Sequence, residues 1–191
     1  MKTITHSYEA AIEVKQSKFI AVLTPYHFFE ETLLRLKVQH PKARHFVAAY
    51  RYRNDYGQIV EYSTDDGEPK GTSGRPVLFV LAGAGLINCA VIVVRYFGGT
   101  KLGTGGLVRA YSDSVNQVIR EASFIEYQEK IATTIVFEYS YSRLVEYLCE
   151  HEGIEILEKK FDLHATYTLQ GTKEEIEKFS DKIPKEIRVL E

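Results

Sequence analysis

The sequence predicts an α+β protein made of two domains. From residue 131 onward, strand-like and helix-like patterns follow one another in the order β-α-β-β-α-β, which is the ferredoxin-like arrangement. Residues 1–130 carry 16 basic and 13 acidic residues, whereas residues 131–191 carry 8 and 13, so the two parts differ in the sign of their net charge. An apolar content of 45% is sufficient for packed cores. We therefore expect an N-terminal domain over residues 1–126 and a ferredoxin-like domain over residues 131–191.

Residues 1–63 predict four strands and one helix. Apolar and polar residues alternate in four segments, which is the pattern of strands with one buried face. Apolar residues recur at helical spacing before Pro41, which ends the helix. The turn residues Asn54-Asp55-Tyr56-Gly57 separate the last two strands. The expected elements are strands at Ser7–Val14 and Phe19–Thr24, a helix at His27–Gln39, and strands at Arg44–Arg53 and Gln58–Ser63.

Residues 64–122 predict a polar loop, a short helix, a buried strand and a long helix. Thr64–Gly74 is rich in glycine and polar residues, and Pro76 suits the first turn of a helix at Val77–Ala84. Ala90–Phe97 is nearly unbroken in apolar character, so we expect a central strand covered on at least one face. The buried side of the long helix is expected to consist of Leu107, Ala110, Tyr111, Ser114, Val115, Val118 and Ala122.

The second domain is predicted to follow a short polar stretch at Glu126–Lys130. Its apolar patterns alternate between the strand period and the helix period. The expected elements are strands at Ile131–Tyr139, Ile154–Phe161, His164–Leu169 and Glu186–Leu190, with helices at Ser142–Glu152 and Lys173–Lys182.

The stretch from Val93 to Arg109 indicates a binding site for an anion. It contains five of the chain's 13 glycines, between an apolar strand and a helix. Glycine lets backbone N–H groups face a ligand, and a helix N-terminus adds partial positive charge. The glycines can instead serve only close packing, and Lys101 is followed by Leu102, so this is not a Walker A loop. The candidate anion- or nucleic-acid-binding residues are Arg95, Gly98, Gly99, Lys101, Gly103, Gly105, Gly106 and Arg109.

The same stretch carries a resemblance to a known family. The run VVRYFGGTKLGTGGLVRAY, preceded by DGEPKGTSGRPVL, resembles the IMPACT/YigZ family, as do the segment EVKQSKFIA and the pair Arg44-His45. The resemblance implies an IMPACT-type N-terminal domain similar to the second domain of ribosomal small-subunit protein five, followed by a ferredoxin-like domain. Eukaryotic members of the family are similar to regulators of the kinase that senses amino-acid starvation. Its bacterial members have no agreed activity.

Carboxylates precede the Gly-rich stretch and predict a polar pocket beside it. Asp65, Asp66 and Glu68 lie within four residues, so they suit a divalent cation, a general base, a solvated turn, or ion pairs with Arg75, Arg95 or Arg109. An arginine at the end of an apolar strand requires a carboxylate or a ligand, since a buried unpaired charge is costly. The residues expected in the pocket are His45, Asp65, Asp66, Glu68 and Arg75, together with Arg95.

Tyrosines interleaved with basic residues are a further feature relevant to nucleic acid. On the strand at Arg44–Arg53, one face carries Phe46, Ala48, Tyr50 and Tyr52. Unstacked bases stack on such rings, while phosphates attract the neighbouring cations. The alternative is that these tyrosines are half-buried core residues.

The remaining observations exclude several classes of function. Cys89 and Cys149 lie in separate segments and are expected to be reduced core thiols, and no histidine has metal-ligand spacing, so we expect no metal and no cofactor. No signal peptide or membrane span is evident, so a cytoplasmic protein is expected. No catalytic residue can be assigned. We favour a non-enzymatic, translation-associated regulatory protein that contacts RNA or a ribosome-associated partner. The alternatives are an enzyme acting on a small phosphorylated ligand and a purely protein-binding adaptor.

Overall fold

The computed structural model describes residues 1–54 and 56–190, which form two compact units of mixed α and β structure, Met1–Tyr127 and Gln128–Glu191. The first unit is built on a five-stranded sheet in which every neighbouring pair is antiparallel, in the order β2-β3-β6-β4-β5. Its strands are β2 (Tyr8–Val14), β3 (Ser17–Pro25), β4 (His45–Arg53), β5 (Ile59–Thr64) and β6 (Cys89–Tyr96).

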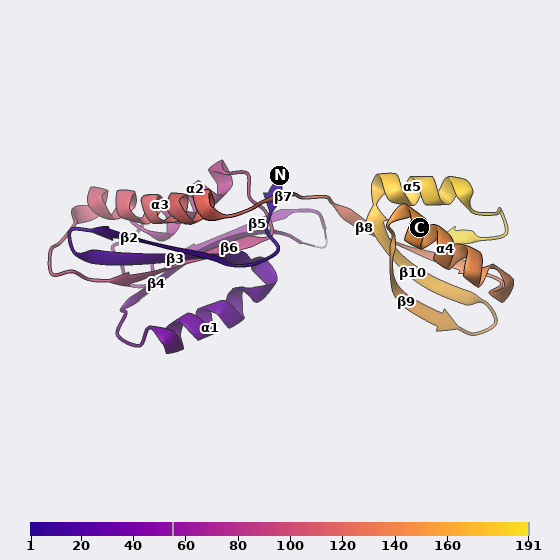
Figure 1. Ribbon diagram of the computed structural model, residues 1–191, viewed down its shortest axis with the longest axis horizontal. Helices are drawn as coiled ribbons and strands as arrows, with labels where there is room; N and C mark the ends of the chain where they lie inside the picture. Colours follow the sequence, from indigo (N-terminus) through magenta and orange to yellow (C-terminus); the bar gives the residue numbers. More distant parts are fainter. Residues whose placement is uncertain (55, 191) are drawn as a thin grey trace. The chain divides into compact units, whose positions relative to one another are not determined.

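Helices cover both faces of this sheet. Figure 1 shows α1 (Phe29–Gln39), which follows the short 3-10 turn η1 (Tyr26–Phe28), on one side of it. On the other side lie α2 (Gly74–Gly83) and α3 (Gly103–Glu121). Successive residues of a strand point to opposite faces, so Ile92 and Val94 of β6 join the cluster beneath α1, whereas Val91 and Val93 join the one beneath α3. This two-sided cover explains why β6 is an almost unbroken apolar run.

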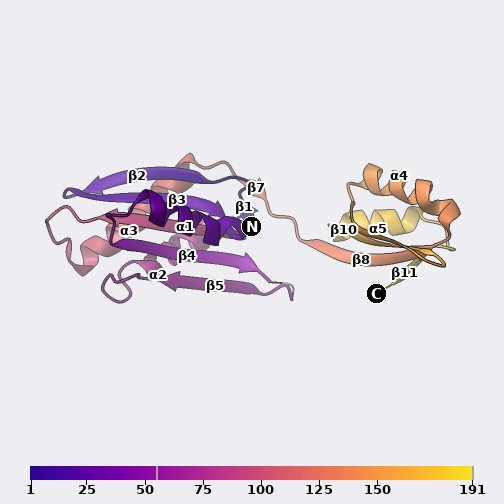
Figure 2. The same cartoon turned by 90° about the horizontal axis from the view of Figure 1, so that it is seen from below.

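Strand β4 shows the alternation that the sequence predicts. Phe46, Ala48 and Tyr50 pack with the cluster that contains α1, while Val47 and Ala49 pack with the cluster beneath α2 and α3. The turn after β4 includes Asp55, which lies outside the described residues. Figure 2 shows β4 and β5 side by side at one edge of the sheet.

The starts of two helices differ from the prediction. Helix α3 begins at Gly103, so Gly103, Gly105 and Gly106 belong to its first turn and not to the preceding loop. Helix α2 begins at Gly74, ahead of Pro76. Apolar periodicity locates the buried face of a helix, but the first turn of each of these helices precedes the first residue of the apolar pattern. A prediction from periodicity alone therefore places the start of each helix too late.

A two-stranded pairing near the ends of the first unit was not predicted. Strand β1 (Lys2–Thr3) pairs with β7 (Ile125–Glu126), and the Tyr127 amide donates to the Met1 carbonyl. This pairing shortens the polar stretch expected at Glu126–Lys130. Two-residue strands carry no periodicity, so only the folded chain reveals them.

The second unit has a four-stranded sheet with two helices over one face. The element order is β8 (Lys130–Phe137), the 3-10 turn η2 (Tyr139–Tyr141), α4 (Ser142–Glu152), β9 (Glu155–Phe161), β10 (Ala165–Thr172), α5 (Lys173–Lys182) and β11 (Arg188–Leu190). The strands lie in the antiparallel order β11-β8-β10-β9. Val145 of α4 and Phe179 of α5 pack on Tyr167 and Leu169 of β10 in a single core. The capping box at Thr172 and Glu175 fixes the start of α5.

Two chain-wide expectations can be compared directly with the structure. Cys89 and Cys149 are both buried free thiols, as predicted, and burial raises the pKa of each. Within the described residues, no helix combines the length and the apolar character required to cross a bilayer.

Candidate anion-binding site

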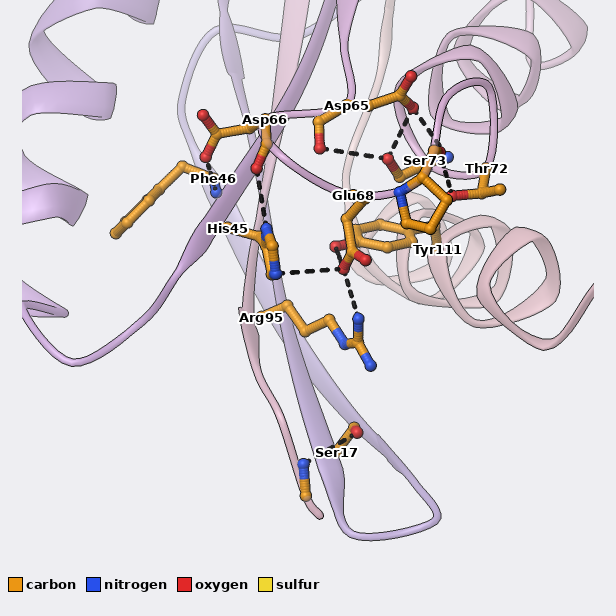
Figure 3. A network of polar contacts seen from close by, with 12 residues as sticks. Ser17, His45, Phe46, Asp65, Asp66, Glu68, Thr72, Ser73, Arg95 and Tyr111 are labelled. Atoms are coloured by element: carbon orange, nitrogen blue, oxygen red, sulfur yellow. Dashed lines mark hydrogen bonds and ion pairs between the residues drawn. The ribbon is translucent and has the colours of Figure 1, made fainter. Parts of the chain in front are cut away.

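The loop between β5 and α2 is closed by the Asp65 carboxylate. Its Oδ1 accepts hydrogen bonds from the amides of Ser73 and Gly74, at 3.1 and 2.8 Å, and from the Ser73 hydroxyl at 2.8 Å. Its Oδ2 accepts the Gly71 amide at 2.7 Å. Burial alone would raise the pKa of Asp65, but these hydrogen bonds outweigh it and lower the pKa below its ordinary value. Asp65 therefore holds the start of α2 through these hydrogen bonds, and it forms no ion pair with the described residues (Figure 3).

The closed loop places Glu68 against Arg95 at the end of β6. The Glu68 side chain is 4% exposed, and its Oε1 accepts Arg95 Nη1 at 2.5 Å. The same oxygen accepts the Tyr111 hydroxyl of α3 at 2.8 Å. Burial, followed by the nearby Glu68 charge, raises the pKa of Tyr111, so this hydroxyl remains a proton donor. A buried arginine is thus paired with a buried carboxylate, as the sequence required.

His45 and Asp66 flank this ion pair. The Asp66 carbonyl can only accept, so His45 Nδ1 donates to it, at 2.8 Å. His45 Nε2 then faces Glu68 Oε1 at 3.9 Å. The Asp66 carboxylate accepts the Phe46 amide at 2.6 Å, which joins the loop to the start of β4.

Arg95 retains donors that no described residue uses. The residue is 5% exposed, and its guanidinium carbon lies over the rings of Phe19 and Phe97, at 5.4 and 5.8 Å from their centroids. Only Nη1 has a partner, Glu68, and the buried Nε has none among the described residues. A buried guanidinium with unused N–H groups favours an anionic ligand.

A pocket opens beside these donors. Its volume is about 350 Å³, and the first turn of α3 forms part of its wall. The pocket combines the Arg95–Glu68 pair with one further cation and a set of apolar side chains. Its lining residues are Glu68, Pro69, Arg95, Phe97, Lys101, Leu102, Gly103, Thr104 and Leu107.

Helix α3 presents an uncapped N-terminus to this pocket. Leu102 occupies the N-cap position and supplies no side-chain hydrogen bond. The first amides of a helix have no partner within it, and they carry partial positive charge. Gly103 has a φ of +74°, a left-handed conformation that glycine adopts without strain. Buried arginine, lysine and helix terminus therefore meet at one place.

Gly98 anchors the loop that precedes α3. An added Cβ at this position would lie 2.0 Å from the Gln16 carbonyl carbon, so only glycine fits against the turn between β2 and β3. The Gly98 amide donates to the Ser17 hydroxyl at 3.1 Å. This amide is therefore used within the protein and is not free for a ligand.

The structure brings together some of the expected site residues and separates others. His45, Asp66, Glu68 and Arg95 form one network. Lys101 lines the pocket, but Arg109 lies two positions beyond Leu107 on an exposed part of α3 and does not line it. Arg75 is exposed and lines a different hollow, with Phe79 and Val108.

Sequence reasoning missed two polar partners. Tyr111 was assigned to the apolar side of its helix, although a buried tyrosine hydroxyl usually requires a partner, which was the available signal. Ser17, fully buried at the start of β3, had no signal in the sequence because its partner is 81 residues away. No cluster of potential metal ligands occurs among residues 1–54 and 56–190.

Comparison with known proteins places these residues in a family context. The model of the Impact N-terminal domain matches residues 15–119, a range that contains the whole network. An IMPACT family member of Haemophilus influenzae is 37% identical over 177 residues, covering 90% of this chain and 84% of the relative. The IMPACT family member YigZ of Escherichia coli is 42% identical over 113 residues, covering 57% of this chain and 55% of YigZ. The chain thus matches just over half the length of this second relative.

A solved structure resembles the chain over nearly its whole length. It is the crystal structure of a hypothetical protein, with a TM-score of 0.80 and 28% sequence identity. The alignment covers 99% of this chain and 95% of the other. The succession of the two units is therefore shared with a protein of known structure.

Proposed function

Because the chain belongs to the IMPACT family, we propose that it is a non-enzymatic, translation-associated regulatory protein that binds RNA through a phosphate-binding site at the start of α3. The translation role rests on the family's resemblance to regulators of the starvation-sensing kinase. The observation that carries the RNA contact is the buried Arg95 guanidinium with unused donors, beside an uncapped helix N-terminus and Lys101. Helix amides and arginine donors are the groups that hold phosphate oxygens in proteins.

We also propose the finer fold assignment. The first unit is assigned to the fold of the second domain of ribosomal small-subunit protein five, and the second to the ferredoxin-like fold. The order β-α-β-β-α-β and the strand order β11-β8-β10-β9 support the second assignment. The units Met1–Tyr127 and Gln128–Glu191 are then the two domains.

The RNA proposal is tested by a salt titration of single-stranded RNA binding to the intact protein. Two phosphate contacts, from Arg95 and Lys101, give a log–log slope of about −1.4, at roughly 0.7 per contact. Lys101→Ala should reduce the magnitude of the slope by about 0.7, without a change in sequence preference. Lys2→Ala is the matched control, because Lys2 is an exposed lysine whose backbone pairs with Gly85 ahead of β6, whereas Arg95 lies near the end of that strand. Salt-independent binding, or no binding at low salt, contradicts the proposal.

A small phosphorylated ligand is the second candidate, favoured by the shape of the pocket. The cation and the helix terminus lie in a hollow of about 350 Å³ with Phe97, Leu102 and Leu107 on its walls. An apolar wall suits a ligand that has both an anionic group and an apolar body. A thermal shift by one small phosphate compound, reduced by Lys101→Ala and unaffected by Lys2→Ala, favours this candidate over RNA.

A further inference from the structure

An aromatic groove lies between α1 and the edge strand β5, and its lining includes Asp66 but none of the residues that line the anion pocket. Its volume is about 300 Å³. Phe29 and Leu33 of α1 form one side, and Tyr50 and Tyr62 form the other. Strand β5 pairs only with β4. Tyr62 is 45% exposed, so this part of the sheet face is open.

Four tyrosines form a continuous row from this groove. The rings of Tyr62 and Tyr50 are stacked, with centroids 5.0 Å apart. Tyr50 is 5.0 Å from Tyr26, and Tyr26 stacks on Tyr52 at 4.1 Å with nearly parallel planes. The row arises because Tyr50 and Tyr52 are two positions apart on β4 and therefore lie on the same face of the sheet. Tyr62 of β5 lies directly opposite Tyr50 in the strand register.

The polar groups of the groove are hydroxyls and carboxylates. The hydroxyls of Tyr50 and Tyr62 make no hydrogen bond with the rest of the described chain, so they can donate to a ligand. Two carboxylates, on Glu30 and Asp66, line the groove together with one cation, Lys37. Burial raises the pKa of Tyr50, with further contributions from Tyr52, Tyr62 and, last, the charge of Glu30, which lines the same groove.

We propose that this groove binds a proline-rich peptide segment in the polyproline II conformation, with a lysine or arginine beside the prolines. Rows of tyrosine rings form the ridged surface on which proline rings pack, and a polyproline II backbone leaves its carbonyl groups free to accept hydrogen bonds from the tyrosine hydroxyls. The excess of carboxylates, with Glu30 beside the row, attracts the basic residue of the peptide. The partner is therefore a protein that contains such a segment.

The contacts and charges of the groove disfavour RNA as an occupant, and the tyrosines distinguish a docked peptide from a strand added to β5. Tyr50 already contacts Tyr26, Phe29, Tyr52 and Tyr62 by ring packing, so its faces are not available for a stacked base. The carboxylates would also repel an RNA backbone. A strand added to β5 would occupy the edge of the sheet and would depend little on the tyrosine side chains.

The test is a calorimetric titration of the intact protein with a synthetic peptide that has prolines at every third position and one terminal arginine. Saturable binding is expected, and Tyr62→Ala should weaken it about tenfold, which corresponds to about 1.4 kcal/mol. Glu30→Lys should also weaken binding and reverse the sign of its salt dependence, because the groove then carries two cations and one carboxylate. Tyr56→Ala is the matched control, because Tyr56 is an exposed tyrosine of the same unit, outside the row, and should leave the affinity unchanged.

Each other outcome overturns the proposal in a distinct way. No binding by a protein with native circular dichroism removes the peptide site. Equal binding of a peptide in which alanines replace the prolines indicates strand pairing or charge alone. If oligouridylate competes with the peptide, and Tyr62→Ala abolishes the binding of oligouridylate, the groove is a nucleobase-binding surface and not a peptide site. Because Glu30 is exposed on α1, Glu30→Lys provides the test if Tyr62→Ala fails to fold.

Discussion

Removal of the Asp65 carboxylate should destabilise the first unit far more than its conversion to an amide. In Asp65→Ala, the Ser73 amide, the Ser73 hydroxyl and the Gly74 amide lose the acceptor Oδ1, and Ser73 is fully buried. A buried donor without a partner costs about 1–3 kcal/mol, and such losses within one network are not additive. We therefore expect a decrease in the free energy of unfolding of about 3 kcal/mol, or roughly 10 °C in Tm.

Asp65→Asn separates hydrogen bonding from charge. An amide oxygen at the Oδ1 position keeps three of the four hydrogen bonds, and the one lost, from Gly71, lies at an exposed residue. The expected decrease is about 1 kcal/mol, from this bond and the interaction of the negative charge with the start of α2. Asp113→Ala, at an exposed aspartate of α3, is the control and should stay within about 0.5 kcal/mol of the wild type.

The pH dependence provides a second readout of the same contacts. The folded-state pKa of Asp65 lies below its ordinary value of 3.8, so its contribution to stability is present above pH 3.8 and is lost as the pH falls through the folded-state pKa. The difference in stability between the wild type and Asp65→Asn should therefore shrink in acid. Thermal and urea unfolding followed by circular dichroism measure both effects. Equal stabilities of Asp65→Ala and Asp113→Ala would refute the assignment of Asp65 as the residue that holds α2.

Two further predictions concern the loop before α3 and the aromatic row. Gly98→Ala should destabilise the protein by more than about 2 kcal/mol and weaken anion binding, because its Cβ would overlap the Gln16 backbone. Gly105→Ala is the control: an added Cβ there meets open space, so this variant should be neutral or stabilising by up to about 1 kcal/mol. Similar urea midpoints for the two variants would contradict this reasoning. Burial, with Tyr52 contributing, raises the pKa of Tyr26 from 10.0 to about 12, so the free energy of unfolding should fall as the pH rises from 10 to 12. The absorbance of tyrosinate should show a group that ionises near pH 12 and is absent in Tyr26→Phe. An unchanged titration in that variant would remove the assignment.

The sequence predicted the secondary structure well wherever burial is periodic. The long helix, the hairpins and the apolar strand β6 all bury one or both faces, and this burial leaves a pattern in the residue types. Helix starts were less well predicted, because the first turn of α3 consists of Gly103, Thr104, Gly105 and Gly106, which carry no apolar period. The pairing of β1 with β7 was missed for the same reason.

The candidate site was predicted in its charges but not in its contacts. The prediction that Arg95 has a carboxylate partner is confirmed by Glu68, because burial of an unpaired arginine is costly in any fold. Which carboxylate would serve was not predictable from three acidic residues in one loop. The left-handed residues Asp66 and Gly67 turn the chain so that Asp65 faces α2 while Glu68 faces Arg95.

The sequence by itself determined the two-part α+β organisation, the central strand with its terminal arginine, and the family, because these depend on local period, local composition and a long continuous motif. Only the tertiary structure decided that Asp65 holds a helix, that Glu68 accepts hydrogen bonds from both Arg95 and Tyr111, and that Arg75 and Arg109 lie outside the pocket. Hydrogen bonds and ion pairs act over about 3 Å in space and leave no trace in sequence separation, which is 43 residues between Glu68 and Tyr111 and 81 between Ser17 and Gly98. The row of tyrosines is of the same kind, since the register of β4 with β5 brings Tyr50 and Tyr62 into contact.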